Sequence, residues 1–312
     1  MNAREPPRPI AVGPGDDGRL VPPGWLDQAS VTRTLLAINV AVFVVQAAGS
    51  ARRGLFAGFD TSQLLRLGAS YPLATIGENR WETLITACFL HGGLLHLGFN
   101  MLALWQAGPL VERAVGSARM APMYLVSGAC GNLLSVASGW LKRTGAPTVG
   151  ASGAILGVVA AALVIGWRVQ GWRGPLTQAM ARWIGFVIVF GLLSGGVIDN
   201  WAHVGGAIAG AVIASTWRLG YRYSVRATRA ILGACLAVLV LCVGIVAWHD
   251  STDRFAAMGV IERFDFAREA LEEGRCRDAH EGLLAVERLR PKMVQVPSLR
   301  AQMDKICGAF GQ

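Results

Sequence analysis

Residues 150–167 have the sequence GASGAILGVVAAALVIGW, in which a serine stands between two glycines at the start of an apolar run. The run carries no charge, and its length of about 17 residues suits a helix that crosses a bilayer core. Small residues let membrane helices approach closely, so Gly150, Ser152 and Gly153 can serve packing alone. A serine at a helix N-terminus also suits a nucleophile, because unpaired backbone N–H groups there can bind an oxyanion. Both interpretations stay open at this point.

The composition of the whole chain favours a membrane protein. The 312 residues are 53% hydrophobic and only 16% charged, whereas soluble domains carry about 25% charged residues. The net charge is +9, but the arginines are scattered among apolar runs. This pattern suits the flanks of membrane spans and disfavours nucleic-acid binding, which needs a basic patch or stripe. Residues 1–30 lack the apolar stretch of a secretory signal peptide, so we expect the first apolar run to be retained.

Seven apolar runs follow one another along the chain, and they lie at about 33–48, 93–111, 119–138, 151–167, 182–198, 201–217 and 230–248. We therefore predict an all-α polytopic membrane protein with a catalytic core of six spans over residues 31–218. A linker and a seventh span follow in residues 219–249. Residues 1–30, rich in proline, are predicted to be a disordered tail. Residues 49–92 are too polar to span, and we expect them to form a loop at the membrane interface.

The distribution of Arg and Lys predicts the orientation of these spans. A cytoplasmic N-terminus places more basic residues on the inner side than on the outer side. The loop before Ser152 is then external, and an odd number of spans puts the C-terminal segment outside as well. We expect the inner membrane of a bacterium as the location.

Residues 250–312 differ from the rest because they are charged, helix-forming and poor in glycine. Five residues in this tail have the spacing of the second half of a tetratricopeptide repeat: Gly274, Ala279, Leu283, Val286 and Pro291. One repeat cannot bury a core by itself, and a plain helical hairpin explains the segment equally well. Either form can bind a protein partner. Cys276 and Cys307 can pair in an oxidising compartment and stay thiols in the cytoplasm.

His203 is one of three histidines in or beside the apolar runs, where ionisable side chains are costly and usually functional. It stands three residues before Gly206 and seven before Gly210, so the three share a helix face. A glycine face brings the imidazole into close contact with another helix. Imidazole is the usual base for a serine nucleophile. The structural alternative is a histidine that only forms a hydrogen bond between helices.

The other two histidines, His91 and His96, are followed by Asn100. His96 and Asn100 are four residues apart, so they share a helix face, and both can donate a hydrogen bond to an oxyanion. A zinc site is the alternative interpretation. The spacing of five residues between His91 and His96 separates the rings, and no carboxylate or cysteine completes a known ligand set. We therefore expect neither a metal nor another cofactor.

Three motifs in this order resemble the rhomboid family of intramembrane serine proteases, and the resemblance covers about residues 30–218. The motifs are His91-x4-His96-x3-Asn100, Gly150-x-Ser152-Gly153 and Ala202-His203-x-Gly205-Gly206. Glu112 and Gly116 after the second span are also similar. Each motif is weak alone, but three on the expected spans and in the expected order are specific.

The resemblance implies that Ser152 is the nucleophile and His203 its general base, a dyad without a carboxylate. His96, Asn100 and the backbone N–H of Ser152 would form the oxyanion hole. Asp199, four residues before His203, would then be a polar group at the membrane surface.

Structural roles near the site are also implied by the resemblance. His91 would shape the entry to the second span, and Gly150 would permit the turn before the nucleophile. Gly153 belongs to the same motif, while Gly206 and Gly210 would allow tight packing of the fourth and sixth spans.

The implied function is an endopeptidase that cleaves transmembrane segments of single-span or polytopic membrane proteins within the lipid bilayer. One alternative is a catalytically inactive relative that binds membrane clients, but such a protein lacks the dyad, and both members are present here. A transporter is a second alternative, and it should show inverted repeats, which are not visible in this sequence.

Two positions depart from the family pattern. Leu156 stands four residues after the serine, where members often carry an aromatic side chain that packs on the catalytic histidine, so we expect an altered orientation of His203. A Trp-Arg pair is also often found before the first motif histidine. Glu82 and Thr83 occupy those places, with Arg80 and Trp81 just upstream, so we expect the loop to be anchored differently.

Overall fold

The structure is a computed structural model that describes residues 30–48, 58–142, 146–194, 198–219, 221, 223–252, 260–289 and 296–308. Within these ranges the regular elements are helices, apart from an isolated antiparallel bridge between Ser70 and Thr148. The all-α prediction is confirmed. The predicted disordered tail falls outside the described residues except for Ser30.

Six helices in the described ranges are long and apolar enough to cross a membrane: α1 (Ser30–Ala48), α4 (Leu94–Val115), α5 (Ser117–Lys142), α6 (Ser152–Gln170), α7 (Pro175–Leu193) and α9 (Val225–Thr252). The chain is thus an integral multi-pass membrane protein. The helix α8 (Asn200–Ser215) has 16 residues, a length of about 24 Å at 1.5 Å per residue. It is shorter than an average span, so the count of seven spans stays a prediction.

The boundaries of α7 correct the sequence prediction, which placed this span at 182–198. Pro175 takes the first position of the helix, where its missing N–H is not needed and its fixed φ suits a helical start. The helix ends at Leu193, and Arg182 lies within it. The predicted span began at Arg182 because arginines usually flank membrane spans, but a single arginine can lie inside a membrane helix when its side chain extends toward the interface.

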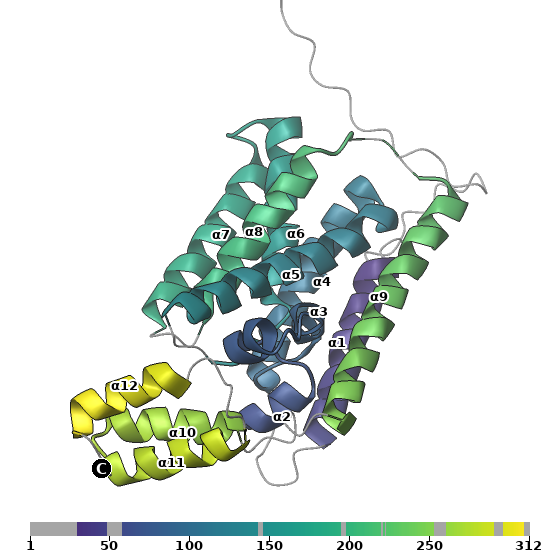
Figure 1. Ribbon diagram of the computed structural model, residues 1–312. Helices are drawn as coiled ribbons and strands as arrows, with labels where there is room; N and C mark the ends of the chain where they lie inside the picture. The colour runs from purple at the N-terminus through teal and green to yellow at the C-terminus, as the bar shows by residue number, and fades with distance from the viewer. Residues whose placement is uncertain are drawn as a thin grey trace, which may run out of the picture.

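The centre of the bundle is α6, which packs against α4, α5, α7 and α8 (Figure 1). Val158, Val159 and Ala161 in its middle are fully buried. A helix that is apolar all round has no face to offer to water, so it takes the central position. The helix that begins at Ser152 is therefore the most enclosed one of the six.

Glycines bring α8 into backbone contact with α6. A Cβ added to Gly206 would overlap the carbonyl oxygen of Gly153, and one added to Gly210 would overlap that of Gly157. Further along, Nη1 of Arg168 on α6 donates to the carbonyl of Trp217, just after α8, at 2.7 Å. The two helices therefore run parallel over the whole length of α8.

The end of the bundle away from Ser152 is fastened by the buried carboxylate of Glu112. Its oxygens accept hydrogen bonds from the backbone N–H groups of Val31 and Thr32 at 2.9 and 2.8 Å. They also accept from the hydroxyls of Thr32 and Ser117 at 2.7 and 2.6 Å. One side chain thus joins the start of α1, the end of α4 and the start of α5.

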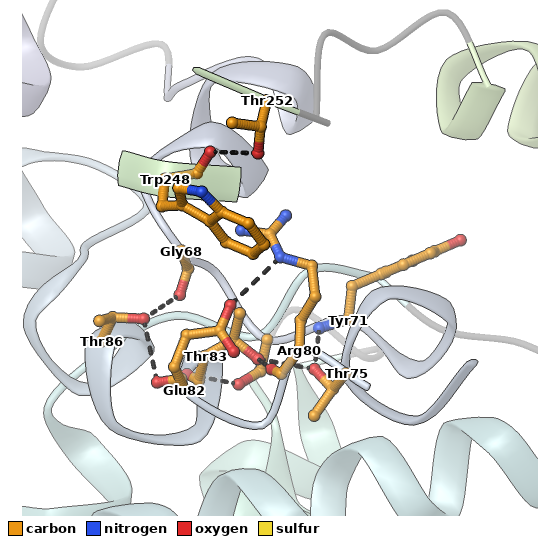
Figure 2. Close-up of polar contacts among 10 residues, drawn as sticks. Gly68, Tyr71, Thr75, Arg80, Glu82, Thr83, Thr86, Trp248 and Thr252 are labelled. Atoms are coloured by element: carbon orange, nitrogen blue, oxygen red, sulfur yellow. Dashed lines mark hydrogen bonds and ion pairs between the residues drawn. The ribbon is translucent and has the colours of Figure 1, made fainter. Parts of the chain in front are cut away.

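The loop before α4 contains short helices: α2 (Thr61–Arg66), η1 (Leu73–Gly77), α3 (Thr83–Thr86) and η2 (Ala87–Phe89). Arg80 is almost completely buried, and its Nε lies 3.3 Å from Oε1 of Glu82. Figure 2 draws this pair with its dashed line. The loop thus encloses a buried ion pair between two residues of its own.

The C-terminal tail consists of α10 (Val260–Glu272), α11 (Cys276–Leu289) and α12 (Val296–Cys307). A disulfide joins Cys276 to Cys307. Figure 1 shows the three helices together at one end of the bundle, where α10 contacts α2. Val246 near the end of α9 lies against Gly68 of the same loop. The tail therefore lies at the end of the bundle where α6 begins with Ser152.

Candidate active site

Ser152 is the first residue of α6, and Ala151 precedes the helix as its N-cap. Gly150 has a φ of 129°, a conformation that L side chains rarely adopt. Its N–H donates to the carbonyl of Ala87 at 3.0 Å. The turn before the serine is thus held against the loop before α4, and the backbone N–H groups at the start of α6 have no partner within the helix.

The imidazole of His96 lies beside this turn. A Cβ added to Gly150 would lie 2.8 Å from Nε2 of His96 and 3.7 Å from Oγ of Ser152. Nδ1 of His96 accepts a hydrogen bond from the N–H of Gly92 at 3.2 Å. A neutral imidazole whose Nδ1 is an acceptor carries its proton on Nε2. The ring therefore presents an N–H donor on the side of the serine.

His203 is buried in the first turns of α8, with 5% of its surface exposed. Its position next to α6 follows from the glycines, since a Cβ on Gly153 would lie 3.0 Å from the carbonyl oxygen of Ala202. In the described part of the chain, Nδ1 of His203 has no hydrogen-bond partner. The base candidate thus lies in the part of α8 that packs against the start of α6, and no acid is bound to its Nδ1.

Asp199 has a structural task that the sequence interpretation missed. Its Oδ1 accepts from the N–H of Ala202 at 3.0 Å, which caps α8. Its Oδ2 accepts from the hydroxyls of Thr148, at 3.0 Å, and Ser135. The carboxylate therefore fixes the start of α8 to α5 and to the segment before Ser152. An aspartate directly before an apolar helix is an N-cap signal, so this role was visible in the sequence.

Asn100 is buried on α4, one turn after His96, and its Nδ2 donates to the carbonyl of His96 at 3.0 Å. An amide nitrogen carries two hydrogens, so one donor remains beyond this bond. Asn100 is therefore bonded to the backbone of α4 one turn before it, and the spacing of four residues places its side chain on the same helix face as His96.

His91 is completely buried before α4. Its carbonyl accepts from Nε2 of Gln46 at 2.6 Å, and its N–H donates to Oε1 of the same side chain at 3.2 Å. Its ring contacts His96 edge to face, with the centroids 5.3 Å apart. Burial, with a smaller effect of His96, lowers the pKa of His91 to about 3, so the ring is neutral. Gln46 lies 45 residues away, and no local pattern points to it.

Two further predictions concern this region. Among the described residues, no three His, Cys, Asp or Glu side chains gather closely enough to hold a metal ion. Leu156 is buried one turn after Ser152, so the position of the family's aromatic residue is filled by an aliphatic side chain.

Comparison with known proteins shows the family to which this sequence is similar. A family model described as the Rhomboid domain matches residues 78–220. The rhomboid protease GluP of Bacillus subtilis (strain 168) is 31% identical over 258 residues, which are 81% of this chain and 48% of that protein. The rhomboid protease AarA of Providencia stuartii is 32% identical over 220 residues, which are 62% of this chain and 74% of that protein. The chain belongs to the rhomboid family.

This rhomboid is also similar to the RHOMBOID-like protein 6, mitochondrial, of Arabidopsis thaliana, with 34% identity over 163 residues, 51% of each chain. It spans about half the length of GluP and of the Arabidopsis protein. GluP and AarA are both named as rhomboid proteases.

Proposed function

We propose that this rhomboid is an active intramembrane serine endopeptidase in which Ser152 and His203 form a catalytic dyad. The observation that carries the proposal is the meeting of three elements at one point. The N-terminus of α6 presents Ser152, α4 presents the Nε2–H of His96 against Gly150 in the turn before it, and glycines hold the helix of His203 against α6. A nucleophile, a base and an oxyanion donor at one helix end are the parts that acyl transfer requires.

The reaction follows from these positions. His203 takes the proton of the Ser152 hydroxyl while Oγ attacks the scissile carbonyl, and the carbonyl oxygen becomes an oxyanion. The Nε2–H of His96, the free N–H of Asn100 and the backbone N–H of Ser152 donate to it. The protonated His203 then gives its proton to the leaving amine, and an acyl-enzyme remains. Water, deprotonated by His203, releases the second product by the reverse sequence.

The substrate is a transmembrane segment of a single-span or polytopic membrane protein. A peptide bond within a helix is shielded, so the segment has to unwind before attack. Segments that contain glycine or proline unwind at lower cost, and we expect them to be preferred. Because Ser152 starts its helix, cleavage falls near the membrane face at which α6 begins. With a cytoplasmic N-terminus, this is the outer face of a bacterial inner membrane.

Reconstitution into lipid vesicles with a fluorescent single-span reporter tests the proposal. The wild-type protein should cleave the reporter, whereas Ser152→Ala and His203→Ala should reduce the rate by more than about a thousandfold. Ser215→Ala is the matched control, because Ser215 is the last residue of α8, at the end of that helix opposite to His203. A folded wild-type protein that binds the reporter without cleaving it would support the client-binding alternative.

A further inference from the structure

The three tail helices share one buried apolar cluster with the interfacial loop. From the loop the cluster contains Leu64, Leu65, Ala69, Tyr71, Leu73 and Leu90, and from the tail mainly Phe264, Ala267, Leu271, Leu283, Leu299 and Met303. Val149, three residues before Ser152, packs against the same cluster. The tail is thus continuous with the core of the loop that holds the turn before the nucleophile.

One hydrogen bond joins the two parts at this contact. The hydroxyl of Tyr71 donates to Oδ1 of Asp265 on α10 at 3.1 Å. The Tyr71 side chain is almost completely buried. Burial, reinforced by the charge of Asp265, raises the pKa of Tyr71 above its ordinary value, so the phenol remains a donor at physiological pH. Burial also raises the pKa of Asp265.

From Tyr71 a network of hydrogen bonds runs through the loop (Figure 2). The N–H of Tyr71 donates to Oγ1 of Thr75 at 3.2 Å, and this hydroxyl lies 2.8 Å from that of Thr83. The neighbouring residue, Ser70, donates through its hydroxyl to the carbonyl of Thr83 at 2.8 Å. Tyr71 and Ser70 are therefore fixed to the same point of the loop.

The network then reaches both halves of the proposed dyad. Ser70 and Thr148 exchange two backbone hydrogen bonds, at 3.2 and 2.7 Å. Thr148 is four residues before Ser152, and its hydroxyl donates to Asp199, which caps the helix of His203. A displacement of Ser70 would thus move Thr148, and with it the start of α6 and the cap of α8.

We propose that Tyr71 and Asp265 are positioning residues, through which the docked C-terminal helices hold the loop, the turn before Ser152 and the start of α8 in their reactive arrangement. This inference rests on the proposed protease function. The tail would then act within the enzyme itself. Its apolar face is covered by the loop and is not available to another protein.

The test measures kcat and KM of reporter cleavage, and the rate at which a fluorophosphonate labels Ser152, in the full-length reconstituted protein. Tyr71→Phe removes the donor and Asp265→Ala the acceptor, while Asp265→Asn keeps an acceptor oxygen. Asp278→Ala is the matched control, since Asp278 pairs with Arg275 on the exposed surface of the tail. Hydrogen exchange of residues 68–90 reports on the loop without any need for activity.

Tyr71→Phe, Asp265→Ala and their combination should each lower kcat and the labelling rate by about threefold to tenfold, the equivalent of one hydrogen bond. KM should stay unchanged, exchange in the loop should increase, and Asp265→Asn should restore most of the rate. Rates equal to those of Asp278→Ala in an active protein would overturn the inference. A double variant whose fold-loss in kcat is the product of the two single losses would also overturn it, because the two residues would then act independently. An unlabelled wild-type protein would instead contradict the proposed function, with loop exchange still reporting on the contact.

Discussion

Gly150 is the position at which one missing side chain matters most for the proposed chemistry. A methyl group there would meet the ring of His96 at 2.8 Å in a backbone with a φ of 129°. We expect Gly150→Ala to slow fluorophosphonate labelling of Ser152 by about tenfold to a hundredfold, because backbone strain and ring displacement cost about 1–3 kcal/mol.

Gly171→Ala is the matched control for this substitution. Gly171 also has a positive φ, of 75°, but no atom lies within 4 Å of the added Cβ. Equal labelling rates for the two variants would show that the ring of His96 has no influence on the serine.

Substitution of Asp199 tests whether the catalytic group is a dyad or a triad that includes this carboxylate. Its carboxylate is occupied by the cap of α8 and by two hydroxyls, and asparagine caps helices as well as aspartate does. Asp199→Asn should therefore retain reporter cleavage within about tenfold of the wild type, whereas loss of a true triad acid costs about 10⁴-fold in kcat. A loss as severe as that of Ser152→Ala would contradict this assignment.

The residues of the site divide into those with a local signal and those without one. The spacings His96 to Asn100 and His203 to Gly206 place side chains on one helix face, so sequence alone groups them. The hydrogen bonds of Gln46 to the backbone of His91 and the bridge between Ser70 and Thr148 join residues that are far apart in the chain. Periodicity carries no information on such pairs, because their partners are fixed only by tertiary packing.

At the scale of elements, the contact between α6 and α8 determines whether nucleophile and base can meet. An added methyl group at Gly210 would overlap Gly157, and relief requires the helices to separate. Gly210→Ala should destabilise the protein by about 1–3 kcal/mol through overpacking and should lower cleavage. Thermal unfolding and reporter assays in detergent measure both effects.

Gly233→Ala in α9 provides the comparison, since a Cβ there has nothing within 4 Å. Alanine favours a helix over glycine by about 1 kcal/mol, so this variant should be neutral or slightly stabilised. Equal melting temperatures for the two variants would contradict the close contact of α6 and α8.

Element boundaries were less predictable than element existence. Apolar runs indicated all the long helices, but α7 begins seven residues before its predicted start because Pro175 and the residues after it are compatible with a helix. The short helices of the interfacial loop could not be predicted. They pack against α9, which contacts α2 and α3 although it lies far away in sequence, and periodicity carries no information on such contacts.

At the scale of the molecule, the path of the chain predicts which segments share a side of the membrane. The tail contacts the interfacial loop, so Cys276 and Cys307 lie on the same side as Ala146, which is exposed shortly before Ser152. The turn at Trp172 joins α6 to α7 and lies at the opposite end. With a cytoplasmic N-terminus, the tail is external.

A membrane-impermeant maleimide in oriented vesicles checks this arrangement. After reduction of the disulfide, it should label Cys276 and Cys307 in the same vesicle orientation as an Ala146→Cys variant, and in the opposite orientation to a Trp172→Cys variant. Labelling of the tail together with Trp172→Cys would contradict the arrangement. Without reductant, the two native tail cysteines should not react, because they are paired.

The central claim is that Ser152 is an activated nucleophile and that His203 activates it. The most direct measurement is mass spectrometry of the fluorophosphonate adduct on the reconstituted wild-type protein and on His203→Ala. The account predicts one modified peptide, with the adduct on Ser152, and loss of the adduct in His203→Ala while Ser215→Ala is labelled like the wild type. An adduct on another serine, or undiminished labelling of Ser152 in His203→Ala, would contradict it.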